Sequence, residues 1–274
     1  MIQIKSDAEI ALMREAGLVV GRTLERLRAA VAPGVSTADL DAIAADSISE
    51  AGATPSFLGY HGFPAVICTS VNDEIVHGIP SPNRILRSGD IVSIDCGAIV
   101  KGYHGDAAVT VPVGDVAPEL TELLRVCEES MWRGFAAARL GGRLSDISHA
   151  IESYVRSQPH PTGGQWGIVE EYVGHGIGTE MHQDPQVYNY APKGPGRGTK
   201  LVRGLALAVE PMVNLGARTT RTLADRWTVV TEDGSASAHF EHTFTVIDSG
   251  PWVLTAADGG RAKLAALGAV PAAV

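Results

Sequence analysis

The sequence predicts an α+β fold in which helices pack against a mostly antiparallel sheet. The prediction rests on two observations. Segments with helical periodicity are followed by apolar, strand-like segments, and this order occurs twice along the chain. In addition, two strand-like segments flank Lys101-Gly102, a two-residue connection that is typical of a β-hairpin.

In the first half of the chain we expect two helices and then strands. Ser6-Asp7-Ala8-Glu9 has the pattern of a capping box, in which serine and glutamate satisfy free backbone N–H groups at the start of a helix. Apolar residues follow at spacings of three and four until Pro33-Gly34 ends this helix. A second helix is expected from Ser36-Thr37 to about Gly52. The predicted strands cover residues 65–71, 74–76, 91–98 and 103–113.

The second half repeats this order. Helices are predicted over residues 118–139 and 145–155, and strands over residues 168–173, 201–209, 228–231 and 239–247. The tripeptide HGI occurs at 77–79 and again at 175–177, which indicates an internal duplication. Residues 1–274 are therefore expected to form one domain with halves at about 1–115 and 116–250, while the Ala-rich tail 258–274 is left unassigned.

Composition argues against several classes of protein. With 274 residues, of which 45% are apolar, the chain can bury a large core. The net charge of −9 argues against a nucleic-acid-binding module, and no apolar run approaches the ~18 residues of a membrane span. Cys68, Cys96 and Cys127 show no paired spacing, and the charged N-terminus does not resemble a signal peptide. We therefore expect a cytoplasmic protein.

Two aspartates lie in the apolar hairpin, Asp95 in its first strand and Asp106 in its second. If the turn is Lys101-Gly102, Asp95 lies opposite Ala108 and Asp106 opposite Gly97. Both carboxylates then point to one face, roughly 7–8 Å apart at Cβ. Like charges at this distance repel, unless one carboxylate is protonated or a cation lies between them. The alternative is a hairpin with one solvated face.

Two glutamates occupy comparable places in the second half. Glu210 follows the apolar residues of LALAVEP, and Glu241 lies in the strand-like HFEHTFTV. A single acid in a strand usually faces solvent, but four acids in four apolar strands favour a common buried site. His175, in GHGIG, adds a nitrogen ligand. Five such ligands suit two divalent ions that share carboxylates, and the ligand types do not choose among Mn, Fe, Co and Zn.

Two further histidines, His77 and His182, follow similar local patterns. Each is compatible with an ordinary core or surface histidine. Beside a two-metal centre, a histidine that binds no metal can donate a hydrogen bond to a substrate carbonyl and stabilise the oxyanion that forms from it.

Five segments together resemble the motif set of the type I methionine aminopeptidases. They are NDEIVHGIP, DIVSIDCGAIVKGYHGDAAVT, YVGHGIGTEMH, LALAVEPMV and SAHFEHT, and the resemblance spans about residues 4–250. Five spaced motifs are far more specific than one short pattern. The resemblance implies the pita-bread fold, with two related halves around a metal pair. It also implies hydrolysis of the peptide bond after an N-terminal methionine when the second residue is small.

The resemblance further implies a role for each ligand. Asp95 would bind one metal ion, and Asp106 and Glu241 would bridge both ions. His175 and Glu210 would complete the second site.

The same resemblance implies catalytic roles for three residues. Glu210 resembles the proposed general base, and His77 and His182 resemble the histidines that contact substrate. The implied partners are N-terminal methionyl peptides and nascent chains, so a transient location near the ribosome stays open. We expect a monomer with no membrane partner and no stable nucleic-acid partner.

A pocket for the methionine side chain is also implied. The positions that match its lining in the family are Tyr60, Phe63, Cys68, Met181 and Trp227. An aromatic, sulfur-lined wall suits a flexible thioether, but these residues are equally typical of an ordinary core.

Several positions depart from the commonest family pattern. Phe57 stands where cysteine is common, Met181 where an aromatic residue is common, and His239 where glutamine is usual. Thr179-Glu180 also differs. These departures concern the pocket and the metal centre, and they leave the expected reaction class unchanged.

Two alternative functions are compatible with the same implied fold. Proline-specific aminopeptidases and prolidases usually carry a large N-terminal domain, and the first expected ligand here, Asp95, comes too early to leave space for one. A binding protein that has lost catalysis would lack metal ligands, whereas all five are present here.

Overall fold

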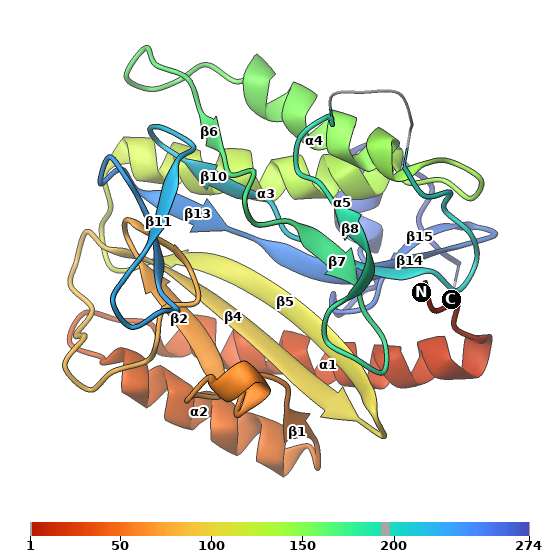
Figure 1. The fold of residues 1–274 in the computed structure, drawn as a ribbon, viewed down its shortest axis with the longest axis horizontal. Helices are drawn as coiled ribbons and strands as arrows, with labels where there is room; N and C mark the ends of the chain where they lie inside the picture. The colour runs from red at the N-terminus through yellow and green to blue at the C-terminus, as the bar shows by residue number, and fades with distance from the viewer. Residues whose placement is uncertain (1, 193–197, 274) are drawn as a thin grey trace.

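The computed structural model describes residues 2–192 and 198–273. Strands lie between two pairs of helices (Figure 1). The first pair is α1 (Asp7–Ala30) and α2 (Thr37–Glu50), and the second pair is α3 (Pro118–Ala137) and α4 (Leu144–Ser157). Strands follow each pair, so the predicted order occurs twice. Within the described ranges, no helix combines the length and the apolar character that crossing a membrane requires.

Side-chain caps fix the starts of the first two helices. The hydroxyl of Ser6 accepts a hydrogen bond from the backbone N–H of Glu9, and the carboxylate of Glu9 accepts one from the backbone N–H of Ser6 at 2.7 Å. This is the capping box predicted for α1. Ser36 and Asp39 form the same arrangement at the start of α2.

The strands pair in antiparallel fashion throughout the described residues. The main sheet has nine strands in the order β1-β4-β5-β14-β9-β7-β8, with β2 beside β4 and β15 beside β14. Two smaller sheets have the orders β13-β10-β6 and β11-β12-β3. The strands are β1 (Thr54–Pro55), β2 (Ile67–Val71), β3 (Glu74–Val76), β4 (Ile91–Val100), β5 (Tyr103–Pro112), β6 (Gly167–Ile168), β7 (Gly174–Gly176), β8 (Gln183–Val187), β9 (Ala206–Val209), β10 (Met212–Asn214), β11 (Thr220–Thr222), β12 (Val229–Thr231), β13 (Ser237–His239), β14 (Glu241–Ile247) and β15 (Gly250–Val253).

The register of the β4–β5 hairpin confirms the prediction. Lys101-Gly102 is the turn, Asp95 pairs with Ala108, and Asp106 pairs with Gly97. Because opposed residues share a face, the two aspartates lie on the same side of the sheet. The left-handed backbone that this turn requires is present, with φ of 49° at Lys101 and 84° at Gly102.

In the second half of the chain, two neighbouring strand pairs are interrupted at the same level of the sheet, which leaves a break in the strand ladder. β9 pairs with β14, and β10 pairs with β13. Glu210-Pro211 separates β9 from β10, and Phe240 separates β13 from β14, so the two interruptions lie side by side. Glu210, His239 and Glu241 therefore flank a single point in the sheet.

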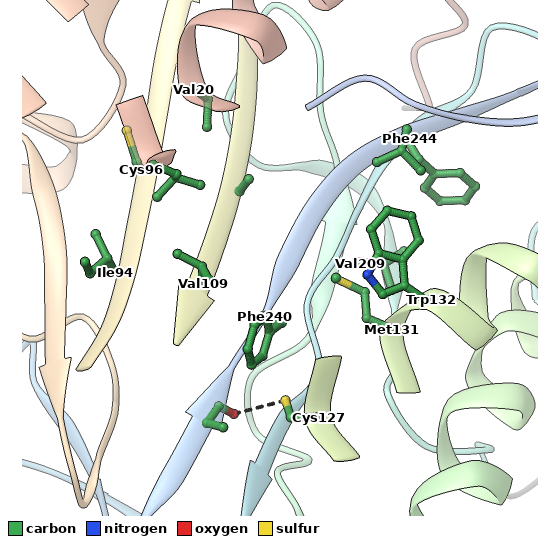
Figure 2. Packing of buried hydrophobic residues seen from close by; sticks show 14 of the residues in the cluster. Val20, Ile94, Cys96, Val109, Cys127, Met131, Trp132, Val209, Phe240 and Phe244 are labelled. Carbon is green, nitrogen blue, oxygen red and sulfur yellow. Dashed lines mark hydrogen bonds between the residues drawn. The ribbon is translucent and has the colours of Figure 1, made fainter. Parts of the chain in front are cut away.

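The apolar core lies between the sheet and the helices. One cluster contains Val20 from α1, Val109 from β5, Trp132 from α3 and Phe244 from β14 (Figure 2). Each such side chain contributes about 1.5–3 kcal/mol when fully buried. Because this cluster contains residues of both helix pairs, it joins the two halves of the molecule.

Three predicted strands differ from the structure: the one expected over 239–247 is interrupted at Phe240, and two others are shorter than expected. The strand expected over 168–173 is only Gly167–Ile168, because extending its register with β10 would bring Glu170 opposite Pro211, which has no N–H to donate. The strand expected over 201–209 is only Ala206–Val209. Gly204 precedes it with a φ of 82°, a left-handed conformation that no strand contains.

The C-terminal region after β14 has defined structure. β15 pairs with β14, and within the unassigned tail residues Arg261–Ala266 form the short helix α5. The guanidinium of Arg14 in α1 donates hydrogen bonds to the carbonyls of Leu254 and Ala256, each at 2.6 Å, which ties the segment after β15 to the first helix.

Gly105→Ala tests the close approach of β5 to α1. A Cβ at Gly105 would lie 2.7 Å from the backbone N of Gly17 and 2.9 Å from the carbonyl carbon of Ala16. Since neither backbone can yield easily, we expect the free energy of unfolding to fall by about 1–3 kcal/mol. Gly164→Ala is the control, because its nearest neighbours are ring atoms of His160 at 3.4 Å. Urea denaturation of both variants checks this, and equal stability would contradict it.

Candidate active site

One cavity of about 400 Å³ collects the residues that the sequence singled out. Its lining consists of Phe57, Tyr60, His61, Phe63, Cys68, His77, Asp95, Asp106, His175, Met181, His182, Glu210, Trp227 and Glu241. Each residue that the sequence analysis expected to bind metal or substrate is therefore present in this lining. The residues come from both halves of the chain.

The hairpin β4–β5 brings Asp95 and Asp106 to this cavity. Asp106 is 2% exposed, and Oδ1 of each aspartate is buried without a hydrogen-bond partner. Burial raises the pKa of Asp95 to about 7. Burial, with the nearby charge of Glu241, raises the pKa of Asp106 well above its usual range. Ionised carboxylates in this position need a cation.

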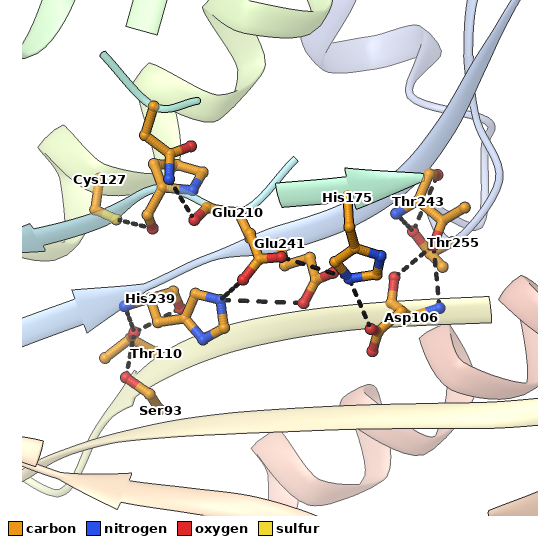
Figure 3. A network of polar contacts seen from close by, with 12 residues as sticks. Ser93, Asp106, Thr110, Cys127, His175, Glu210, His239, Glu241, Thr243 and Thr255 are labelled. Atoms are coloured by element: carbon orange, nitrogen blue, oxygen red, sulfur yellow. Dashed lines mark hydrogen bonds and ion pairs between the residues drawn. The ribbon is translucent and has the colours of Figure 1, made fainter. Parts of the chain in front are cut away.

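Glu210 and Glu241 reach the same cavity from the break in the ladder. Oε1 of Glu241 is also buried without a partner. Burial raises the pKa of both glutamates, and the charge of Asp106 adds to this effect at Glu210. Figure 3 shows that the side-chain contacts between these acids run through two imidazoles, those of His175 and His239.

The tautomer of His175 is set by its neighbour. Nδ1 lies 2.9 Å from the carbonyl oxygen of Gly176, and since a carbonyl can only accept, Nδ1 carries the proton. Nε2 therefore presents a lone pair, 3.5 Å from Oε1 of Glu210 and 3.8 Å from Oδ2 of Asp106. Burial lowers the pKa of His175 to about 3, so the ring is neutral. A lone pair directed at carboxylates is unfavourable unless a cation lies between them.

These donors fit divalent metal ions. Asp106, His175 and Glu241 each offer a ligand atom, and the three atoms lie within 4.8 Å of one another. Glu210, His239 and Glu241 form a second group by the same criterion. Buried carboxylate oxygens without partners, combined with imidazole, are ligands that Zn, Mn, Fe and Co accept.

His77 and His182 line the cavity outside both donor groups. Burial lowers the pKa of His77 to about 4, and its ring meets that of Trp227 edge-on at a centroid distance of 6.4 Å. Nδ1 of His182 lies 2.8 Å from the hydroxyl of Tyr60, and burial lowers the pKa of His182 as well. Both rings can therefore act as neutral hydrogen-bonding groups beside the acids.

The opposite end of the cavity is apolar. A separate buried cluster consists of Phe57, Phe63, Ala65, Cys68 and Met181, with Tyr60 and Trp227 packed against it. The rings of Phe63 and Trp227 meet edge-on at a centroid distance of 5.1 Å. The cavity thus has an acidic end and an aromatic, sulfur-lined end.

Three histidines near the site received no role from the sequence. His61 lines the cavity with a left-handed φ of 48°. Nδ1 of the buried His104 lies 2.9 Å from the hydroxyl of Ser56. His239 belongs to the second donor group. Strand alternation could have pointed to two of them in the sequence. His104 and His239 each precede an acidic ligand candidate by two residues, so each is expected on the same face of its strand as that acid.

Comparison with known proteins agrees with this geometry. The matching family model is metallopeptidase family M24, over residues 11–248. A methionine aminopeptidase of Clostridium acetobutylicum is 53% identical over 255 residues, which are 93% of this chain and 99% of that protein. Methionine aminopeptidase 1 of Bacillus subtilis is 51% identical with the same coverage.

Solved structures give the same result. The crystal structure of methionine aminopeptidase from Thermotoga maritima has a TM-score of 0.88 and 40% identity, covering 93% of this chain and 99% of that one. A prolidase from Pyrococcus furiosus, at 20% identity and a TM-score of 0.70, shares the fold, and the matched part is 65% of that protein. These neighbours confirm the predicted pita-bread fold. The chain therefore belongs to metallopeptidase family M24 and, within it, to the methionine aminopeptidases.

Proposed function

We propose that this chain removes the N-terminal methionine from peptides and nascent proteins when the second residue is small, with two divalent metal ions in its active site. The observation that carries the proposal is the cavity itself, which joins a cluster of buried carboxylates to an aromatic, sulfur-lined wall. Relatives at 51–53% identity over 93% of the chain carry the name methionine aminopeptidase, which supports the same activity here.

Five residues would hold the two ions. Asp95 would bind one ion, Asp106 and Glu241 would lie between both, and His175 and Glu210 would complete the other site. The unpartnered carboxylate oxygens and the lone pair of His175 support these roles. When bound, such a metal pair lowers the pKa of a water molecule and polarises the scissile carbonyl.

Glu210 would act as the general base. Its carboxylate is buried, which raises its pKa, so Glu210 can hold a proton taken from water near neutral pH. His77, neutral because burial lowers its pKa to about 4, would donate a hydrogen bond to the substrate carbonyl. His182, positioned by its 2.8 Å contact with the hydroxyl of Tyr60, would do so from a second direction.

The apolar end of the cavity would receive the methionine side chain. Tyr60, Phe63, Cys68, Met181 and Trp227 would line this pocket. Contacts between sulfur and aromatic rings contribute ~0.3–1.5 kcal/mol each, which favours a thioether over an aliphatic chain of the same length. The carboxylates at the other end favour the amine of a free N-terminus, so the arrangement supports exopeptidase action.

We further propose that the chain works as a cytoplasmic monomer with one catalytic domain. The core cluster that joins both helix pairs supports a single domain. A net charge of −9 disfavours stable binding to RNA, so any encounter with nascent chains near the ribosome would be transient.

Asp106→Asn tests the metal-dependent reaction. We expect release of methionine from Met-Ala-Ser to fall by at least about 100-fold, because losing a ligand costs more than the 10–100-fold typical of its supporting partners. Asp46→Asn, an exposed substitution on α2, should keep full activity. The assay compares chelator-treated protein before and after addition of Co, Mn, Fe or Zn. Equal activity of the two variants, or cleavage of Pro-Ala-Ser alone, would contradict the proposal.

Asp95→Asn is expected to stabilise the metal-free protein. Burial raises the folded-state pKa of Asp95 from 3.8 to about 7, so the folded state binds more protons and the contribution of Asp95 to stability is lost as pH rises through 7. The free energy of unfolding of Asp95→Asn should exceed that of the wild type by about 1 kcal/mol more at pH 8 than at pH 6.

Urea denaturation of both proteins in chelator at the two pH values measures this difference, and effects of the buried histidines cancel in the comparison. With metal bound, the variant should be the less stable protein. An advantage that does not change with pH would show that Asp95 is not held in a destabilising site.

His77→Gln and His182→Gln separate substrate contacts from metal binding. Each should lower kcat/KM for Met-Ala-Ser by about 10²–10³-fold, as removal of one oxyanion donor does, while metal content stays unchanged. His149→Gln, on the exposed face of α4, is the control and should leave both quantities unchanged. Loss of metal in either active-site variant would overturn the assigned roles.

A further inference from the structure

His239 is a buried imidazole whose free nitrogen points at two carboxylates. The residue is 2% exposed, and its Nε2 has no hydrogen-bond partner. Nε2 lies 3.7 Å from Oε2 of Glu210 and 4.0 Å from Oε2 of Glu241. Figure 3 shows the ring beside these two glutamates, on the side away from His175.

The distances are those of ligands that share an ion. Two donor atoms that each lie about 2.1 Å from one ion can be at most about 4.2 Å apart, and both His239 distances fall below this limit. A direct hydrogen bond would need a distance of about 3.2 Å or less. The separations of His239 from its two acids also match those of His175, which are 3.5 Å and 3.8 Å.

We propose that Nε2 of His239 is a second imidazole ligand of the metal centre, binding the ion that lies beside Glu210 and Glu241. This inference rests on the proposed function and adds a residue to its ligand set. Glu210 then lies between two imidazoles, with Oε1 toward His175 and Oε2 toward His239.

The electrostatics of the site agree with this role. Nε2 of His239 is too far from either glutamate for a direct hydrogen bond, so the ring leaves both carboxylates without a partner on this side. A divalent ion between the three groups satisfies the lone pair and both negative charges.

The backbone holds His239 in position. The hydroxyl of Thr110 donates to the carbonyl of His239 at 2.8 Å and accepts from its N–H at 2.9 Å. Ser93 contacts the same hydroxyl at 2.9 Å. His239 and Glu241 are two residues apart across the break in the ladder, so both side chains lie beside Glu210 while Phe240 enters the core. Such support limits the reorganisation that metal binding requires.

A second imidazole changes which metals the site prefers. Carboxylate oxygens suit Mn, whereas imidazole nitrogen favours Co and Zn. A ligand role therefore predicts an effect that depends on the metal. If His239 only oriented Glu210 by a hydrogen bond, its replacement would weaken all metals alike.

His239→Gln is the variant that separates these roles, because its amide can donate a hydrogen bond but is a poor ligand for Co and Zn. We expect its dissociation constants for Co and Zn, measured by competition with a chromogenic chelator, to rise by more than about 100-fold, beyond the 10–100-fold typical of residues that only support a ligand. The constant for Mn should change less than about threefold. His242→Gln is the matched control, since it replaces an imidazole three residues away that contacts Thr255 and Trp132 on the other face.

X-ray absorption of the wild-type protein loaded with two equivalents of Co provides a test without substitution. Two imidazoles per metal pair are expected, falling to one in His239→Gln. One imidazole in the wild type, or equal weakening of Co and Mn in the variant, would overturn the ligand role while leaving the proposed function intact. Failure of the wild type to bind any of these metals would instead refute the two-metal function itself.

Discussion

The confinement of four carboxylates in one largely apolar cavity is the constraint on which this structure depends. Burial raises the pKa of Asp95, Asp106, Glu210 and Glu241, and at the last three the charge of another member adds to the effect. Removing an ion from water costs several kcal/mol, and like charges at this separation add to that cost. At neutral pH the four groups can be ionised together only with cations beside them, so metal binding, the raised pKa values and the chemistry of the site have one physical origin.

The fold supplies the rigidity that this confinement needs. Asp95 and Asp106 come from the long hairpin β4–β5, whose register sets them on one face. Glu210, His239 and Glu241 flank the break where Pro211 and Phe240 interrupt neighbouring strand pairs. Side chains held on strands or directly at strand ends keep their geometry better than side chains on loops. The helices lie against a separate apolar cluster, so the core stabilises the sheet without entering the site.

Sequence reasoning was most accurate where local rules dominate. The hairpin turn, both faces of β4 and β5, and the capping box of α1 follow from two-residue turn chemistry, strand alternation and helix caps. It was least accurate where distant segments decide. The short β6 depends on meeting Pro211 across a sheet edge, and the late start of β9 depends on the left-handed Gly204. The periodicity of the sequence around each strand does not show that Pro211 or Gly204 limits it.

The same division applies to the site. The acids were identified because charge in an apolar strand is unusual in itself, and His175 was added to them from its place between glycines in GHGIG. His239 was noted only as a departure from a pattern, since a lone histidine is compatible with many environments. Its significance appears once the break in the ladder brings its free nitrogen within 4.0 Å of two glutamates. The sequence shows the residue types, but it does not show that the two strand pairs bring His239 close to these glutamates.

Anomalous diffraction from crystals of the Co-loaded protein would show whether cations lie among the buried carboxylates. The expected result is two strong peaks inside the cavity, one beside Asp95 and one beside His175, with Asp106 and Glu241 contacting both. A cavity without anomalous density at saturating Co, with the four carboxylates still buried, would contradict it. Protonation would then be the means by which the protein tolerates these charges.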